Sequence, residues 1–366
     1  MKQPAKISRR HFVQLAGSAS LMSAAGSRFT WATTRTGAAR FAYVGTEHAI
    51  HLYSISDDQH LVLRQTIATA RPVAMRISGG HLYAANGVSQ YGNLPRGTVE
   101  SYTISPMTGE LAFKNRVPLS LSATSPRDLA VAPDGRSLVV AVHGGGAYNV
   151  VPFADNGSLE TVSGILKEIG SGPHRLQTAA HPSAVIFDRK GRVLTADQGS
   201  DKLSVFALHN GRLMVSTRRE VPAGSGPASV VLHPDGRTVY VAHALNGSLS
   251  SHEYSESGMI GGKQTLRVTA MGTVAALAIH PAGEMLYSSH GNGLQMWKIL
   301  RDGSLEPSQG LDAVSARKLH VTEDGNSLLG LSDDGVIRMA IDPATRRLAS
   351  PVKVASLSGP ISIATA

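Results

Sequence analysis

The sequence predicts an all-β fold, a seven-bladed β-propeller, because two turn patterns recur along it. In the first pattern, two short runs rich in β-branched residues flank a turn of the Pro-Asp-Gly type, as in residues 230–242. In the second, a polar pair, a glycine and a leucine form a turn between longer strands, as in residues 301–305. Both patterns favour hairpins of antiparallel strands. A four-stranded unit that recurs about every 40 to 55 residues is typical of propeller blades.

The start of the repeat can be followed along the chain. It occurs at Pro72, Pro126, Pro182, Pro227, Val274, Ala316 and Pro360. One blade is divided between two segments, because residues 41–46 and 49–55 look like the second and third strands of a unit, and residues 359–364 match its first strand. We expect this last strand to complete the first blade, which removes a free sheet edge and closes one propeller domain over residues 40–366.

Two of the units are longer than the others. Their extra residues lie at 88–97 and at 166–180. Loops that exceed the hairpin minimum often carry function, although a tolerated surface insertion explains them equally well. We therefore keep both loops as candidates for the surroundings of a site.

Composition excludes several kinds of chemistry. The chain has 366 residues, 42% of them hydrophobic, which is enough for a sizeable core. It has no cysteine, which excludes disulfides and thiolate chemistry. The net charge is +9, but five of the positive charges lie before Ala32 in a segment without acidic residues. The remaining surface is only mildly basic and has no clustered basic stripe, so we expect no nucleic-acid partner.

The amino-terminal residues have the pattern of a targeting signal. Ser8-Arg9-Arg10-His11-Phe12 precedes an apolar stretch, residues 15–25, with no charge before Arg28. This arrangement resembles a twin-arginine export signal. The stretch is too short and too weakly apolar to span about 30 Å of hydrocarbon. We expect residues 1–32 to be an export signal, cleaved after Ala25 or Ala32, and the protein to be periplasmic or secreted without a stable membrane span.

Strand direction predicts which polar residues share a site. The starts of inner strands and the ends of second strands should meet at one mouth of the central channel. His143, His243 and His290 stand at nearly equivalent places in their repeats. The candidates from inner-strand starts are Arg127, His181 and Arg317; from second-strand ends Asn86, His143, Asp197, His243 and His290; and from the preceding loop Arg175 and Gln177.

The repeats resemble those of a known family. Residues 125–153, 181–208, 226–254 and 314–348, together with Ala-Asp-Gln-Gly-Ser-Asp-Lys at 196–202, are similar to the seven-bladed propeller lactonases, the group of 6-phosphogluconolactonase and the carboxymuconate lactonising enzyme. The resemblance implies hydrolysis of a sugar lactone at the channel mouth. Its departures lie at four places where the family usually has a second histidine, an Arg-His pair, a glutamate and an arginine: here these are Ser183, Ala228-Ser229, Ala244 and His290.

The resemblance also implies roles for individual residues. His181 would be the general base, since a reference pKa near 6.5 suits the activation of water, and His290 would assist it. Arginines there could hold a carboxylate or phosphate through paired hydrogen bonds. The substrate-binding candidates are Arg127, Arg175, Gln177, Asp197 and Arg317. The partner would be a small lactone or another anionic ligand, bound by a monomer.

Two other functions stay open at this point. One is an exported propeller that binds a ligand or a protein without catalysis, which the departures from the family pattern favour. The other is a divalent metal site formed by His143, His243 and His290, because imidazole is a common metal ligand and three imidazoles can hold a catalytic ion. Apart from such a metal, we expect no cofactor.

Overall fold

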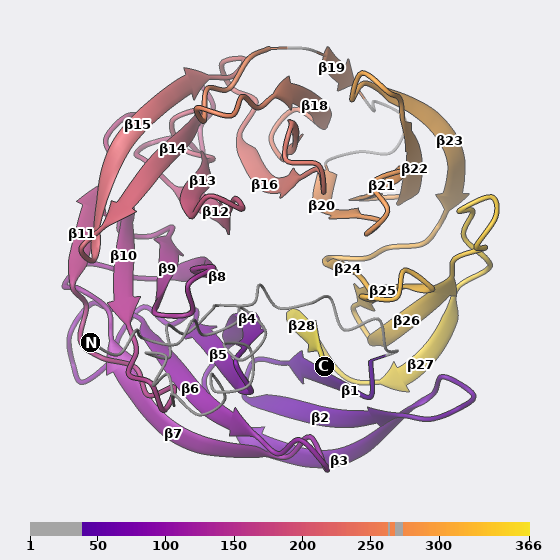
Figure 1. Ribbon diagram of the computed structural model, residues 1–366, viewed down its shortest axis with the longest axis horizontal. Helices are drawn as coiled ribbons and strands as arrows, with labels where there is room; N and C mark the ends of the chain where they lie inside the picture. Colours follow the sequence, from indigo (N-terminus) through magenta and orange to yellow (C-terminus); the bar gives the residue numbers. More distant parts are fainter. Residues whose placement is uncertain (1–38, 263, 268–273) are drawn as a thin grey trace, which may run out of the picture. The chain divides into compact units, whose positions relative to one another are not determined.

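The structure, a computed structural model, describes residues 39–262, 264–267 and 274–366. The expected export signal over residues 1–32 lies outside these residues. Within them, the chain forms seven four-stranded antiparallel sheets and no helix, and so no helix able to cross a membrane. The predicted all-β, seven-bladed propeller is confirmed, and Figure 1 shows the blades arranged around a ring.

The blades are numbered from the amino-terminal side, and each is given with its innermost strand first. Blade 1 consists of β28 (Ser362–Thr365), β1 (Phe41–Gly45), β2 (Ala49–Ile55) and β3 (Leu61–Ala68). Blade 2 consists of β4 (Pro72–Ser78), β5 (His81–Asn86), β6 (Thr98–Ile104) and β7 (Leu111–Pro118). Blade 3 consists of β8 (Pro126–Val131), β9 (Ser137–Val142), β10 (Ala147–Pro152) and β11 (Gly164–Lys167).

The other four blades follow the same order. Blade 4 consists of β12 (Pro182–Phe187), β13 (Arg192–Asp197), β14 (Lys202–His209) and β15 (Arg212–Glu220). Blade 5 consists of β16 (Pro227–Leu232), β17 (Thr238–His243), β18 (Ser248–Glu253) and β19 (Gln264–Arg267). Blade 6 consists of β20 (Val274–Ile279), β21 (Met285–His290), β22 (Gly293–Ile299) and β23 (Leu305–Asp312). Blade 7 consists of β24 (Leu319–Val321), β25 (Ser327–Ser332), β26 (Gly335–Ala340) and β27 (Val352–Ser356).

Blade 1 is closed by the last strand of the chain, as the sequence predicts. Strand β28 pairs antiparallel with β1, with Thr365 opposite Ala42 and Ser362 opposite Gly45. The backbone N–H groups of Arg40 and Phe41 also donate to the carbonyl oxygen of Ala366. This pairing satisfies the inner edge of β1, which would otherwise offer unpaired backbone groups to other chains.

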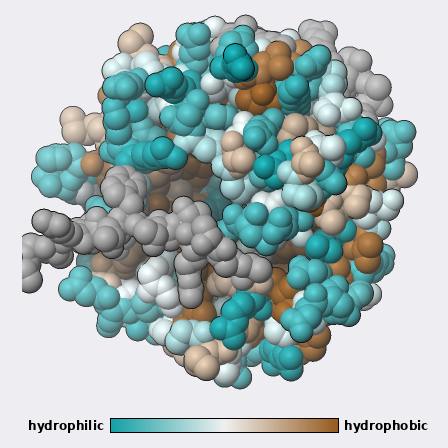
Figure 2. Space-filling model, turned by 45° about the vertical axis from the view of Figure 1, so that its right-hand side comes forward, coloured by the Kyte–Doolittle hydropathy of each residue, from teal (hydrophilic) through white to brown (hydrophobic). Residues whose placement is uncertain are grey.

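The core lies between neighbouring blades. In one cluster, Tyr83 and Val99 of blade 2 pack with Leu129 and Val140 of blade 3. The second strands β9, β17 and β21 are buried along their whole length because a blade packs on each face of them. The outer strand β15 instead alternates between exposed and half-buried residues. Figure 2 accordingly shows mostly hydrophilic residues on the visible surface, with separate hydrophobic groups among them.

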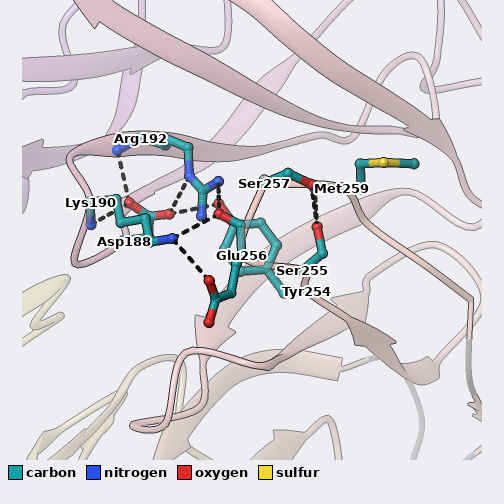
Figure 3. A network of polar contacts seen from close by, with 8 residues as sticks. All are labelled: Asp188, Lys190, Arg192, Tyr254, Ser255, Glu256, Ser257 and Met259. Atoms are coloured by element: carbon teal, nitrogen blue, oxygen red, sulfur yellow. Dashed lines mark hydrogen bonds and ion pairs between the residues drawn. The ribbon is translucent and has the colours of Figure 1, made fainter.

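A buried carboxylate joins blades 4 and 5 at their β12–β13 and β18–β19 turns. The Asp188 Oδ2 accepts hydrogen bonds from Arg192 Nε at 2.6 Å and from the Tyr254 hydroxyl at 2.9 Å. Arg192 Nη1 and Lys190 Nζ both donate to the carbonyl oxygen of Glu256. Figure 3 shows how this network (residues 188, 190, 192, 254 and 256) links the two turns. These polar contacts link the two blades beside the apolar cluster in which the Tyr254 ring packs.

Five inner strands begin with the same irregularity. The register shifts by one residue in β4, β8, β12, β16 and β20, directly after the first paired residue. Such a bulge leaves one residue out of the ladder and re-aims its side chain. The bulged residue is Arg127 in blade 3 and Ser183 in blade 4.

Candidate functional site

The upper face is the end of the blades at which the inner strands begin. Pro126 pairs with Val142, Pro182 with Asp197 and Pro227 with His243, so inner-strand starts and second-strand ends do share this face. Two loops, residues 88–97 and 119–125, border the start of β8. They are joined by backbone hydrogen bonds from Ser122 N to Pro95 O, from Gly97 N to Ala123 O and from Ser125 N to Val88 O.

The glycines after β9 lie directly against these loops. A Cβ on Gly144 would come within 2.8 Å of Thr124 O, and one on Gly145 within 2.3 Å of Ser122 O. No side chain fits in either place. The glycine run is therefore required by close backbone packing, and this packing positions His143, which directly precedes it.

Two histidines from neighbouring blades stack on each other at the upper face. The rings of His143, after β9 of blade 3, and His181, before β12 of blade 4, have centroids 4.4 Å apart and planes 9° apart. Both side chains are half-buried. The structure thus brings these two predicted site residues together, ring against ring.

The proton position on His181 follows from its hydrogen bond. Its Nδ1 lies 3.0 Å from the carbonyl oxygen of His143. A carbonyl oxygen can only accept, so Nδ1 carries the hydrogen and donates it. In the neutral ring the lone pair is then on Nε2. His181 is thus held in the tautomer that leaves Nε2 able to take a proton.

Asp197 holds the backbone around His181 in place. Its Oδ1 accepts from the backbone N–H groups of His181 at 2.8 Å, Gly199 at 2.9 Å and Ser200 at 3.0 Å. Burial raises the pKa of Asp197, and the backbone donors act in the opposite direction. A Cβ on Gly199 would come within 1.9 Å of Ala179 O, so this turn is closed tightly. Asp197 is a predicted substrate-binding residue, but in the structure its carboxylate holds the backbone around His181.

The approach loop contributes one buried and one exposed residue. Gln177 is buried; its Oε1 accepts from His174 N at 3.1 Å and its Nε2 donates to Gln198 O at 2.8 Å. It therefore ties the loop to the segment after β13. Arg175 is exposed on the same loop and has no ion-pair partner within the described ranges.

His143 is neutral at ordinary pH. Burial, followed by the nearby charges of His181 and Arg127, lowers its pKa to about 4, against a smaller raising effect of the contact with the Gln198 side chain. Arg127 follows Pro126, which pairs with Val142, so Arg127 and His143 lie at the same end of blade 3. The side chain of Arg127 is exposed.

Arg317 and His290 have other partners in the structure. The Arg317 guanidinium forms an ion pair with Asp333 at 2.5 Å, and both side chains are largely exposed. His290 is 1% exposed, and its Nε2 lies 2.7 Å from Ser288 Oγ. Burial among the strands of blade 6 removes His290 from contact with solvent at the upper face. The structure thus gives no support to its predicted assistance of His181.

His243 belongs to a buried polar chain in blade 5. Its Nδ1 lies 3.1 Å from Ser225 Oγ and its Nε2 2.7 Å from Ser250 Oγ, which in turn lies 2.8 Å from His252 Nε2. Burial, then the charge of the neighbouring histidine, lowers the pKa of His243 to about 4. Asn86, the remaining candidate from a second-strand end, is also buried and bonded to Thr69 and Thr98.

The metal hypothesis finds no support in the part of the chain that the structure describes. No group of three His, Cys, Asp or Glu side chains there is placed to hold a metal ion. His143 stacks on His181, whereas His243 and His290 are each bonded to serine hydroxyls inside different blades. The three histidines occupy equivalent positions in the repeat, but their side chains do not come together at one point.

Two basic residues near the ring axis were not predicted. Lys318 directly precedes β24, the inner strand of blade 7, and His320 lies within it. The charges that act on Lys318 are those of Asp128, Arg127 and Arg76 from blades 2 and 3. The signal was present in the repeat alignment, because Lys318 occupies the place that is alanine or serine in most of the other blades.

Comparison with known proteins agrees with the fold. The family model described as "Lactonase, 7-bladed beta-propeller" matches residues 16–365. The 6-phosphogluconolactonase of Bacillus subtilis (strain 168) is 29% identical over 161 residues, which are 44% of this chain and 46% of that protein. That match therefore spans about half of the relative. The 6-phosphogluconolactonase of Yersinia pestis (strain Pestoides F) is 24% identical over 334 residues, 85% of this chain and 93% of that protein.

Two solved structures show the same architecture. A putative 6-phosphogluconolactonase from Bacteroides fragilis has a TM-score of 0.82 at 21% identity, over 91% of this chain and 99% of its own. A periplasmic gluconolactonase of Pseudomonas aeruginosa has a TM-score of 0.81 at 21% identity, over 89% and 98%. At such identity these likenesses show the fold alone. Because the family model covers nearly all of the sequence, the chain belongs to the seven-bladed β-propeller lactonase family.

Proposed function

We propose that this protein is a lactonase that hydrolyses a sugar lactone, as 6-phosphogluconolactonases do, at the upper face beside His181. The observation that carries the proposal is the hydrogen bond from His181 Nδ1 to the His143 carbonyl oxygen, which leaves Nε2 free to act as the base on a half-buried side chain. Family membership and the names of the relatives support the same reaction class.

The reaction needs one base and a stabilised oxyanion. His181 Nε2 takes a proton from water while the water oxygen attacks the lactone carbonyl carbon, and the carbonyl electron pair moves onto oxygen. As that pair returns, the bond to the ring oxygen breaks, and the imidazolium of His181 gives its proton to the leaving oxygen. The product is an open hydroxy acid. Arg127 supplies positive charge near the oxyanion, and neutral His143 stacks on the imidazolium without repelling it.

Purified protein tests this proposal directly. Hydrolysis of δ-gluconolactone and of its 6-phosphate is measured above the spontaneous rate, for the natural chain and for His181→Ala. Loss of a general base should lower kcat by about a hundredfold or more. His209→Ala is the control, because His209 is exposed at the end of β14, outside the candidate site. Equal rates for all three proteins would refute the role of His181.

One observation favours a different function, a propeller that binds its ligand without cleaving it. Ser183 occupies the position at which the family resemblance suggests a second histidine. Its hydroxyl lies 3.1 Å from Ala196 O and 2.8 Å from Pro227 O, and so serves to link blades 4 and 5. Binding of the lactone with turnover no faster than the spontaneous reaction would establish this alternative.

We also propose that the protein is exported by the twin-arginine route and acts as a periplasmic or secreted monomer on a small lactone. The support is the sequence Ser8-Arg9-Arg10 with the apolar stretch that follows it. A folded, cysteine-free propeller suits a route that transports folded chains.

A further inference from the structure

One hairpin of blade 4 turns on an asparagine followed by a glycine. Strand β14 runs away from the upper face, so its turn into β15 lies at the opposite end of the blade. His209 and Arg212 close this hairpin, and Asn210 and Gly211 form its loop. Both loop residues have positive φ, 48° for Asn210 and 72° for Gly211, as short hairpin loops favour.

An asparagine that precedes a glycine can react with the backbone. The glycine nitrogen attacks the side-chain Cγ, the bond from Cγ to Nδ2 breaks, and ammonia leaves with the hydrogen that the glycine nitrogen gives up. Water then opens the resulting cyclic imide at one of its C–N bonds, which leaves an aspartyl or an isoaspartyl residue. Glycine has no Cβ to hinder the attack. The reaction needs an attacking N–H that is not engaged elsewhere and a side chain that is free to rotate.

Four of the five Asn-Gly pairs in the chain have the glycine N–H restrained. In three pairs it donates to a carbonyl oxygen: Gly87 to Arg71 at 2.8 Å, Gly157 to Ala154 at 2.8 Å and Gly247 to His243 at 3.1 Å. In the fourth, Gly293 belongs to the β21–β22 ladder, opposite His290. A bonded N–H has to be released before it can attack, which slows the reaction.

Some of these asparagines are restrained through their side chains as well. Asn86 is buried. The Asn156 Oδ1 accepts from the backbone N–H of Ser158 at 2.9 Å, and the Asn246 Oδ1 accepts from that of Ser248 at 3.0 Å. Such local bonds restrict the rotation that would bring Cγ to the glycine nitrogen.

Asn210 has neither restraint. Within the ranges that the structure describes, the N–H of Gly211 makes no hydrogen bond. Asn210 is exposed, and its Nδ2 lies 3.1 Å from Nε2 of His209, which is exposed too. A hydrogen bond between two exposed groups is readily exchanged for one to water.

We propose that Asn210 is a modification site, at which the folded protein loses ammonia and forms an aspartyl or isoaspartyl residue through a cyclic imide with Gly211. The inference goes beyond the proposed function, because the turn lies at the other end of blade 4 from His181 and the reaction needs no substrate.

The surroundings of this turn give the modification a structural effect. The Gly211 carbonyl oxygen accepts from Ser163 Oγ of blade 3 at 3.0 Å, and a Cβ on Gly164 would come within 2.2 Å of the same oxygen. An isoaspartyl residue lengthens the backbone of the loop by one carbon. It therefore displaces a carbonyl that is packed closely against the start of β11.

Peptide mapping by mass spectrometry tests the site. The natural chain is aged in mildly alkaline buffer, folded and, in parallel, in denaturant, and each Asn-Gly peptide is scored for exchange of the amide NH2 for OH. In the folded protein we expect Asn210 to react about fivefold faster or more than each of the other four, which first have to release a hydrogen bond. In denaturant, which removes these restraints, the five rates should differ little.

The proposal is overturned if Asn210 of the folded protein reacts no faster than the other four asparagines, or reacts only in denaturant. Asn210→Gln is the matched variant, since it keeps a side-chain amide but would need a larger ring, which closes more slowly. Ageing should lower the melting temperature of the natural chain and leave that of Asn210→Gln unchanged. The same melting temperature for the two aged proteins would refute the effect on the contact with blade 3.

Discussion

The behaviour of His181 is controlled by atoms of other residues. The His143 carbonyl oxygen sets its tautomer, the His143 ring covers one of its faces, and Asp197 holds its backbone. None of these atoms belongs to a group that reacts. These supporting contacts fix the orientation and the proton position of the His181 ring, as hydrogen bonds do for a histidine that binds a metal.

Asp197 offers the sharpest test of this support. Asp197→Ala leaves the backbone N–H groups of His181, Gly199 and Ser200 without their acceptor. A buried unsatisfied donor costs about 1–3 kcal/mol. We expect a lower melting temperature together with a lower kcat. Asp197→Asn keeps an oxygen acceptor and should retain more of both, so equal losses in the two variants would contradict this role.

Buried histidines should make the protein sensitive to acid. Burial lowers the pKa of His243 and of His252 to about 4, below the value near 6.5 of an unfolded chain. Between pH 6.5 and pH 4 the unfolded chain binds more protons, so the free energy of unfolding falls as the pH falls, by up to about 1.4 kcal/mol per pH unit for each histidine. The melting temperature, measured from pH 7 to pH 4.5, should decrease.

Removing one of these histidines should flatten that dependence. His252→Gln should give a shallower decrease of the melting temperature with acid than the natural chain. His209 is exposed at the end of β14, away from these buried histidines, so His209→Gln is the control and should keep the natural slope. An unchanged slope in His252→Gln would mean that His252 is not the buried neutral group described here.

At the level of strands and turns, the two ends of blades 4 and 5 have separate tasks. The upper end carries His181, whereas the β12–β13 and β18–β19 turns carry the Asp188 network. The upper end positions reactive groups, and the lower turns hold the blades together. A change in the lower network should therefore alter stability without altering catalysis.

Tyr254→Phe tests this separation. The substitution removes the hydroxyl that donates to Asp188 Oδ2 at 2.9 Å and keeps the aromatic ring. The loss of one hydrogen bond to a charged group should lower the free energy of unfolding by about 1.5–3 kcal/mol. Chemical denaturation measures this loss. The hydrolysis rate should stay unchanged, and a fall in kcat would show that the two ends are coupled.

The strands could be predicted from sequence more fully than the site. The turn residues recur in each blade, so the sequence predicts each hairpin separately. The bulges at the starts of the inner strands were not predicted. Side-chain roles depend on neighbours that do not repeat. Arg127 and Arg317 occupy equivalent positions, yet among the described residues only Arg317 of the two forms an ion pair, with Asp333. His143 and His290 are also equivalent, but His143 lies beside His181 and His290 is enclosed in blade 6.

For the whole molecule, ring closure and export are the properties open to test. Deletion of residues 359–366 removes β28 and the acceptor for the amides of Arg40 and Phe41. Ala364 also leaves its apolar cluster. We expect a loss of several kcal/mol from buried area at about 25 cal/mol per Å², seen as a lower melting temperature. A truncated protein with the same melting temperature as the full-length protein would exclude this closure.

The export proposal predicts where the protein accumulates. Replacement of Arg9 and Arg10 by lysine keeps the charge but removes the paired arginines that the export receptor reads. The variant should remain in the cytoplasm, and cell fractionation with an antibody to the propeller measures this. Undiminished protein in the periplasm would indicate another route.

The pairing of β28 with β1 also has a consequence for the order of events during synthesis. These strands are neighbours in one sheet but lie near opposite ends of the described chain, with Ala42 opposite Thr365. A growing polypeptide on the ribosome can form the middle blades. The pairing of β1 with β28, however, can form only after β28 has been synthesised. Contacts between such distant residues form slowly. A transport system that accepts only folded cargo would then in effect select chains whose translation has run at least as far as β28.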